Sequence, residues 1–228
     1  MAVVQFGPIV SDARKKVGGV VFTKSRFGSI VRKKVSPVQP RTSAQLDVRA
    51  SLTDFSKSWS GALTAAERAA WNAFTKNNPV KDVFGNTVSL TGLQMYVRLN
   101  QALTTVGGTP ITNPPSSLVV GYPGSLTVAI SHTGPAYSIT PTNAPGANDA
   151  PVIESTGVVS AGKTFLTTKY RIIAIEAAAA TPPFLVPTEY VTKFGSIVAN
   201  STIATRLSYT NFLTGAQSLG TTSIDVAA

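Results

Sequence analysis

The closest match to a chemical motif in this chain runs from Gly157 to Thr164, where the sequence reads GVVSAGKT. It fits the phosphate-binding pattern GxxxxGK[ST], in which a glycine-rich turn opens a helix and surrounds a phosphate with backbone amides and the lysine. The residues that follow, 165–173, are typical of an extended strand instead of a helix. We therefore interpret the match as a coincidence and predict no nucleotide site.

Other groups that could catalyse a reaction or hold a metal are scarce. The chain has no cysteine and one histidine, His132. This excludes disulfides, zinc–thiolate sites, a cysteine nucleophile and a multi-histidine metal centre. No serine lies in a nucleophile elbow, and the ten acidic residues are scattered. The sequence predicts a protein that is not an enzyme and has neither a metal site nor a cofactor.

The remaining chemistry is electrostatic. The 228 residues carry 20 Lys and Arg against 10 Asp and Glu, a net charge of +10. Residues 1–60 contribute +8, residues 61–100 contribute +2, and residues 101–228 contribute zero. This asymmetry predicts a polyanion or an acidic protein surface as the neighbour of the first part. A basic face that meets only water is the alternative.

Much of this charge lies on a predicted β-hairpin. Two β-branched runs, 17–23 and 28–35, flank a turn at 25–28, which is typical of antiparallel strands. A basic ribbon with interleaved aromatic residues, here Phe22 and Phe27, can follow phosphates or dock on an acidic protein groove. The predicted binding residues are Lys24, Arg26, Arg32, Lys33 and Lys34.

Helices are expected to follow the hairpin. The first would start at a cap formed by Thr42 or Ser43. Its apolar face would be built from Val48, Leu52, Phe55 and Trp59, which are spaced by four, three and four residues. Capping boxes at 64–67 and 91–94 predict two more helices. We expect three large aromatic residues of this region to form its core: Trp59, Trp71 and Tyr96.

Strand patterns dominate the rest of the chain. Between the second and third helices, Gly85–Asn86 suits the turn of a small hairpin with strands at 82–84 and 87–89. After a Gly-, Pro-, Ser- and Thr-rich segment, short strands are expected at 126–132, 137–140, 151–154, 170–175, 203–209 and 223–226, with a helical turn at 189–195. This pattern is typical of an immunoglobulin-like sandwich.

These elements define the predicted architecture. The fold class is α+β, with an N-terminal β-hairpin plus helices and a C-terminal immunoglobulin-like β-sandwich. The expected domains are a basic anchoring domain (1–103), a linker (104–123) and the sandwich (124–228). No run approaches the ~20 apolar residues that span a membrane, and no secretory signal is expected.

The N-terminal part contains a set of glycine, proline, valine and other residues at Gly7, Pro8, Gly18, Gly19, Val20, Val21, Pro37, Pro40, Arg41 and Thr42. Further along are the segments 63–74, 84–86, 159–175 and 188–195, and Thr214–Gly215. In these residues and segments the chain resembles a family of uncharacterised structural proteins from bacteriophages and prophages.

The resemblance implies a virion component, a head or tail accessory or decoration protein, that docks through its basic N-terminal half. Its expected partners are other capsid or tail proteins and further copies of itself in the particle, with packaged DNA as an additional contact and no membrane. Its expected location is the virion, and the host cytoplasm before assembly. The alternative is a phage nucleic-acid-binding protein that uses the basic hairpin.

Overall fold

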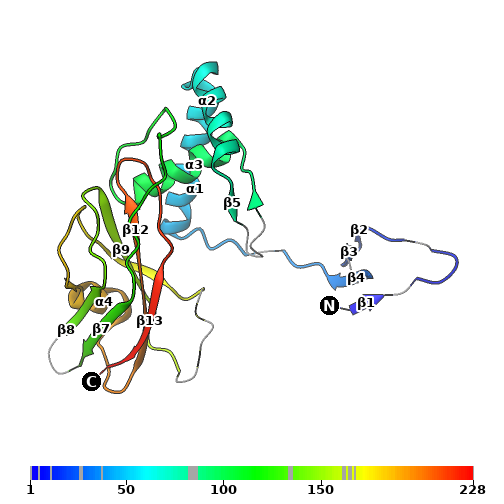
Figure 1. Ribbon diagram of the computed structural model, residues 1–228. Coiled ribbons are helices and arrows are strands. Elements are labelled where there is room, and N and C mark those ends of the chain that lie inside the picture. The colour runs from blue at the N-terminus through cyan, green and yellow to red at the C-terminus, as the bar shows by residue number, and fades with distance from the viewer. Residues whose placement is uncertain are drawn as a thin grey trace. The chain divides into compact units, whose positions relative to one another are not determined.

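The computed structural model describes residues 2–4, 6–10, 12–25, 28–36, 38–81, 87–132, 136–160, 163, 166 and 168–227. The chain divides into two compact units, residues 1–46 and residues 47–228, and each is described by itself. Helices occur together with antiparallel sheets (Figure 1). The predicted α+β class is therefore confirmed.

The first unit is a four-stranded antiparallel sheet in the order β1–β4–β3–β2. Its strands are β1 (Ala2–Val4), β2 (Lys15–Val17), β3 (Val20–Ser25) and β4 (Gly28–Lys33). The predicted hairpin is confirmed, because β3 and β4 pair along their length. The strand predicted at 17–23 is wrong at its start. Gly18, with φ +56°, and Gly19 form a two-residue turn that separates β2 from β3.

Three helices follow: α1 (Ser43–Gly61), α2 (Ala65–Asn77) and α3 (Gly92–Thr105). Both predicted capping boxes are confirmed. In α2 the amide of Glu67 donates to the Thr64 hydroxyl, and the Thr64 amide donates to the Glu67 carboxylate. In α3, Thr91 and Gln94 exchange the same two hydrogen bonds. These bonds satisfy amides that the first turn of a helix otherwise leaves without a partner.

The three helices enclose an aromatic core. Trp71 and Tyr96 are buried, and their ring centroids lie 5.5 Å apart. Trp59 packs against this core, with its ring centroid 5.6 Å from that of Tyr96. The prediction that these three residues are core is confirmed.

The apolar face predicted for α1 is only half covered. Phe55 and Trp59 pack against α3, but Val48 is 60% exposed and Leu52 is 50% exposed. The exposure of Val48 follows from the length of the partner helix. The Ser51 hydroxyl bonds Gln101, one turn before α3 ends. The first two turns of α1 therefore extend past α3.

A short antiparallel pair, β5 (Val80–Lys81) and β6 (Thr87–Val88), lies between α2 and α3. The predicted turn at Gly85–Asn86 and the strand predicted at 82–84 lie outside the described residues.

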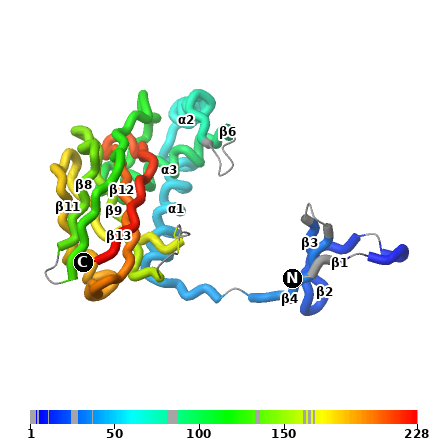
Figure 2. The backbone as a smooth tube through the Cα atoms, turned by 60° about the horizontal axis from the view of Figure 1, so that its bottom comes forward, coloured from blue at the N-terminus to red at the C-terminus, as the bar shows by residue number. Residues whose placement is uncertain are grey.

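The remaining strands form two antiparallel sheets (Figure 2). One has the order β10–β9–β12–β13, with β9 (Asp149–Ser155), β10 (Arg171–Ile175), β12 (Thr202–Asn211) and β13 (Thr221–Val226). The other has the order β11–β8–β7, with β7 (Leu126–Ser131), β8 (Ala136–Pro141) and β11 (Phe184–Leu185). The six predicted strands are confirmed, as is the helical turn, which is α4 (Pro187–Phe194). The two-residue strand β11 is additional.

Side chains from both sheets meet in one core. It contains Ile130, Tyr137, Ile139, Ile153, Phe184, Val186, Tyr190, Ile203, Leu207, Tyr209 and Ala227. A buried polar contact also joins the sheets. The Tyr137 hydroxyl, from β8, lies 2.9 Å from the Ser155 hydroxyl in β9 and 2.6 Å from the Thr205 hydroxyl in β12.

The segment predicted as a linker, 104–123, contains no helix or strand after Thr105 and is held to the elements on both sides. The Asn100 side chain accepts from the amide of Ile111 at 2.7 Å and donates to its carbonyl at 3.1 Å. The Trp71 indole N–H donates to the carbonyl of Thr112 at 2.7 Å, and Asp149 accepts from the amide of Gly121 at 2.8 Å. The segment thus lies packed within the second unit. Whether residues 124–228 fold without the helices stays a prediction.

Candidate interaction surface

The sheet of residues 1–46 has no core of its own among its described residues. None of its described side chains is buried, and the central valines, isoleucine and phenylalanines are only half-buried. A small sheet is stable by itself in water only where it has three or more strands with an apolar face or packs against a helix. In this unit the described apolar side chains stay partly exposed.

The strand register determines which side chains share a face of this sheet, because residues directly opposite each other point to the same side. Phe22 lies opposite Lys15 and Val31, Val20 lies opposite Val17 and Lys33, and Ser29 lies opposite Lys24 and Val4. Phe6 joins this side, with its ring centroid 6.2 Å from that of Phe22. We call it the aromatic face: Val4, Phe6, Lys15, Val17, Val20, Phe22, Lys24, Ser29, Val31 and Lys33.

The opposite side is less apolar. Val21 lies opposite Lys16 and Arg32, and Thr23 lies opposite Ile30. Lys34 continues the same alternation beyond Lys33, and its amide donates to the carbonyl of Gly19. We call this side the basic face: Lys16, Val21, Thr23, Ile30, Arg32 and Lys34.

The predicted binding residues are divided by this geometry. Lys24 and Lys33 belong to the aromatic face, whereas Arg32 and Lys34 belong to the basic face. Arg26 lies outside the described residues. The sequence reasoning missed Lys15 and Lys16, one on each face. Their run with Arg14, just before Gly18–Gly19, is the signal that could have identified them.

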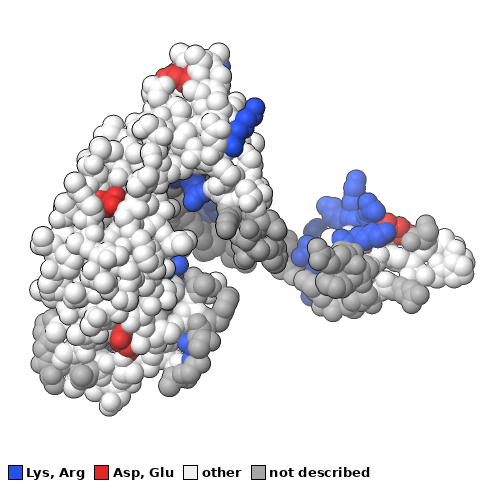
Figure 3. All heavy atoms as spheres, in the orientation of Figure 1, with Lys and Arg blue, Asp and Glu red and all other residues white. Residues whose placement is uncertain are grey.

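The charge of this unit is almost uncompensated. Residues 1–46 contain nine Lys and Arg and one acidic residue, Asp12, and thus carry +8, whereas residues 47–228 carry +2. Blue atoms accordingly gather on the first unit in Figure 3. Asp12 contacts Arg14 at 3.0 Å and Lys24 at 3.7 Å. Desolvation opposes the shift in the pKa of Asp12, but the Arg14 hydrogen bond and the charges of Lys24 and Arg14 outweigh it and lower that pKa.

The phosphate-binding pattern lies between two antiparallel strands. Gly157 to Lys163 belong to the connection from β9 to β10, and Val159 bridges to Thr202 of β12. The next regular element among the described residues is the strand β10. The described residues of this connection contain no helix N-terminus, which the motif needs to bind phosphate, and Ala161, Gly162 and Thr164 lie outside them.

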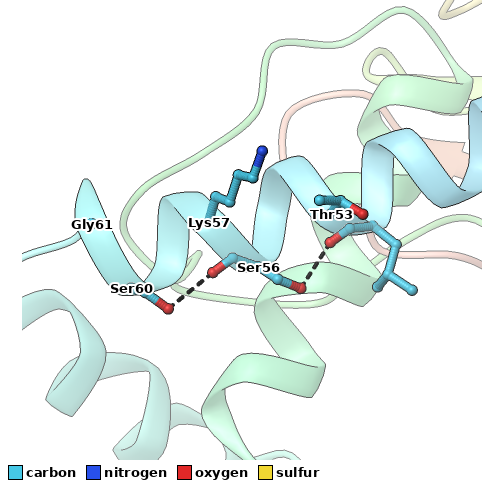
Figure 4. A pocket seen from close by; sticks show the side chains of 6 residues that line it. Thr53, Ser56, Lys57, Ser60 and Gly61 are labelled. Carbon is cyan, nitrogen blue, oxygen red and sulfur yellow. Dashed lines mark hydrogen bonds between the residues drawn. The ribbon is translucent and has the colours of Figure 1, made fainter.

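A hollow beside α1 offers little chemistry (Figure 4). It is lined by Leu52, Thr53, Ser56, Lys57, Ser60 and Gly61. The three hydroxyls donate to carbonyls four residues earlier in the same helix, at 2.8–3.1 Å. Their protons are therefore used within the helix, and Lys57 supplies the one charge of the lining.

The described residues contain no group of three or more histidine, aspartate or glutamate residues placed to hold a metal ion. None of their helices combines the length and the apolar composition that crossing a membrane requires.

Comparisons of the chain with models of protein families, with curated proteins and with solved structures each give no match.

Proposed function

We propose that this protein is a structural component of a bacteriophage virion, a head or tail accessory or decoration protein that docks through its basic N-terminal unit. The observation that carries the proposal is the sheet of residues 1–46, which has a +8 charge and no buried side chain among its described residues. The half-exposed apolar side chains of such a sheet become buried when it assembles with another surface. The protein would be made in the host cytoplasm and then enter the particle.

The second unit supports a structural role in a different way. It contains two complete clusters of buried side chains, one between the helices and one between the sheets. It can therefore serve as a stable body that the docking unit attaches to a particle, and that packs against further copies there. The scarcity of groups suited to catalysis supports a role without an enzymatic reaction.

We further propose that the two sheets form an immunoglobulin-like sandwich. With the seven strands lettered A to G from β7 to β13, one sheet holds A, B and E, and the other holds D, C, F and G. The constant-type arrangement has D beside E instead, so D would have moved to the other sheet. The Tyr137–Thr205 contact joins strands B and F, the two strands that a disulfide links in antibody domains.

Nucleic-acid binding is the alternative, and the basic face is the observation that favours it. Lys16, Arg32 and Lys34 share this side with few apolar groups. DNA binding would release counterions, so affinity would fall log-linearly with salt, with a slope of about one per phosphate contacted. Docking on a protein also buries apolar area, which salt affects little.

Quantitative mass spectrometry of purified phage particles tests the proposal. We expect the full chain in the particles at a fixed ratio to the major capsid or tail protein, after washing in high salt. Its absence from particles, with the protein present in the infected cell, would overturn the structural role. A steep salt dependence of binding to duplex DNA by the purified protein would favour the alternative.

A further inference from the structure

We infer that the aromatic face of the first unit is the docking face, and that it binds a protein surface with an apolar centre and carboxylates at its rim. The inference rests on the proposed function and names the chemistry of the partner. It predicts that the two sides of one small sheet, with equal numbers of basic residues, have different roles.

The aromatic face has apolar side chains at its centre and lysines around them. Phe22 and Val31 lie opposite each other on the central strands β3 and β4, with Val20 next to them on β3. The lysines lie at the ends of the three cross-strand rows. Lys15 is on the edge strand β2, Lys24 ends the row through Ser29, and Lys33 ends the row through Val20 and Val17.

An apolar centre surrounded by cations is complementary to an apolar centre surrounded by carboxylates. The centre supplies burial, and the rim supplies orientation and faster association. The face has room for a partner, because none of its described residues is buried and Val17, on the edge strand β2, is 64% exposed.

Three partners can be compared by their charge: a second copy of this unit, duplex DNA and an acidic protein surface. A second copy of this unit would bring another +8 to the same interface, and like charges across an interface cost binding energy. Duplex DNA would pair with the lysines but would place phosphates against Phe22 and Val31, whose burial would then be incomplete. An acidic protein surface satisfies both the lysines and the apolar centre.

The test compares two single charge reversals in the full chain, Lys33→Glu and Lys16→Glu. The two lysines flank neighbouring residues of β3, because Lys33 lies opposite Val20 and Lys16 lies opposite Val21. The variants therefore have the same net charge and differ in the face they alter. The probe is a random glutamate–tyrosine copolymer, with polyglutamate and a DNA duplex for comparison.

We expect the copolymer to bind more tightly than polyglutamate at 0.3 M salt, as apolar burial is resistant to screening. Lys33→Glu should weaken copolymer binding about fivefold, and Lys16→Glu less than about twofold. Lys33→Gln and Lys16→Gln repeat the comparison without adding a negative charge, in case reversal disturbs the sheet. They should show the same order with smaller changes.

Equal weakening by both reversals, a stronger effect of Lys16→Glu, or no effect of either would overturn the inference. So would tighter binding to the DNA duplex than to the copolymer at 0.3 M salt, which would assign the surface to nucleic acid. Mass spectrometry of purified phage particles tests the proposed function separately. If the protein were absent from virions, the copolymer result would still decide the role of the aromatic face.

Discussion

Residues 47–228 bury their large side chains in two clusters, whereas residues 1–46 bury none among those described. The two units also differ in charge, at +2 and +8. In the larger unit, the helices pack around one core and the two sheets pack around another. In the smaller unit, a regular sheet forms with its apolar centre partly uncovered. Under the proposed function, the first unit supplies the interface and the second supplies a stable body.

Limited proteolysis should give the largest contrast between the units. A sheet without a core opens at a low free-energy cost, while cleavage within a packed core requires nearly global unfolding. Trypsin should therefore cut after Lys24 or Lys33 roughly a hundredfold faster than after Arg206, whose partner is Glu154 in the second unit. Mass spectrometry of the digest should show a stable fragment that starts between residues 34 and 50. Cleavage after Arg206 at the same rate as cleavage after Lys24 or Lys33 would contradict this prediction.

Removal of one aromatic side chain from each unit should change the free energy of unfolding by very different amounts. Trp71→Ala removes a fully buried indole and its hydrogen bond to Thr112, so the free energy of unfolding should fall by about 3–5 kcal/mol. Phe22→Ala, in the sheet, should change the main urea transition by less than about 0.5 kcal/mol. Similar losses from both changes would mean that the first unit contributes to the same cooperative core.

Two tyrosines of the core between the two sheets, Tyr137 and Tyr190, allow a finer comparison within the second unit. Their ring centroids lie 5.3 Å apart, but their hydroxyls differ. That of Tyr137 contacts Ser155 and Thr205, whereas that of Tyr190 is buried without a hydrogen-bond partner. Tyr137→Phe should therefore cost about 1–3 kcal/mol, because two buried hydroxyls lose a partner. Tyr190→Phe should be neutral or stabilising in the same urea titration.

Tyr190 also makes this comparison depend on pH. Burial raises the pKa of Tyr190 to about 12 from an ordinary value of 10. The free energy of unfolding is therefore highest below pH 10 and falls as the pH rises toward 12, because the hydroxyl of Tyr190 ionises first in the unfolded chain. The unfolding midpoint of Tyr190→Phe should fall less than that of the wild type over this range. Parallel curves would show that the Tyr190 hydroxyl ionises equally in both states.

Local sequence signals predicted much of the second unit. The capping boxes at Thr64 and Thr91 and the β-branched runs act within a few residues, and they form where predicted. The strands β1, with three residues, and β11, with two, were missed because so few residues cannot show the alternation of a strand. The exposure of Val48 was missed for a different reason. Helical spacing identifies an apolar face but does not show where the partner helix ends.

The candidate surface was predicted only in part. The density of positive charge pointed to the segment that forms the sheet of the first unit, but counting charges grouped Arg32 with Lys33, which the period-two alternation of a strand places on opposite sides. Lys15 and Lys16 were missed because the strand at 17–23 was extended through Gly18–Gly19. The turn there adds a fourth strand and brings two more lysines to the sheet.

The two capping boxes allow the smallest expected effect to be measured against a built-in control. Glu67 accepts hydrogen bonds from the Thr64 hydroxyl and backbone amide, which lower the pKa of that carboxyl below its ordinary value of 4.5. Gln94 occupies the equivalent position beside Thr91 and does not titrate.

Thr91→Ala should cost about 1 kcal/mol at every pH at which the protein is folded. Thr64→Ala should cost a similar amount at neutral pH but less in acid. A carboxylate with a lowered pKa contributes stability above its unfolded pKa, and this contribution is lost as the pH falls through the folded value. Urea titrations of both variants at pH 7 and pH 3.5 measure the change. An equal loss for Thr64→Ala at both pH values would show that the hydroxyl of Thr64, and not the charge of Glu67, provides the stability of this cap.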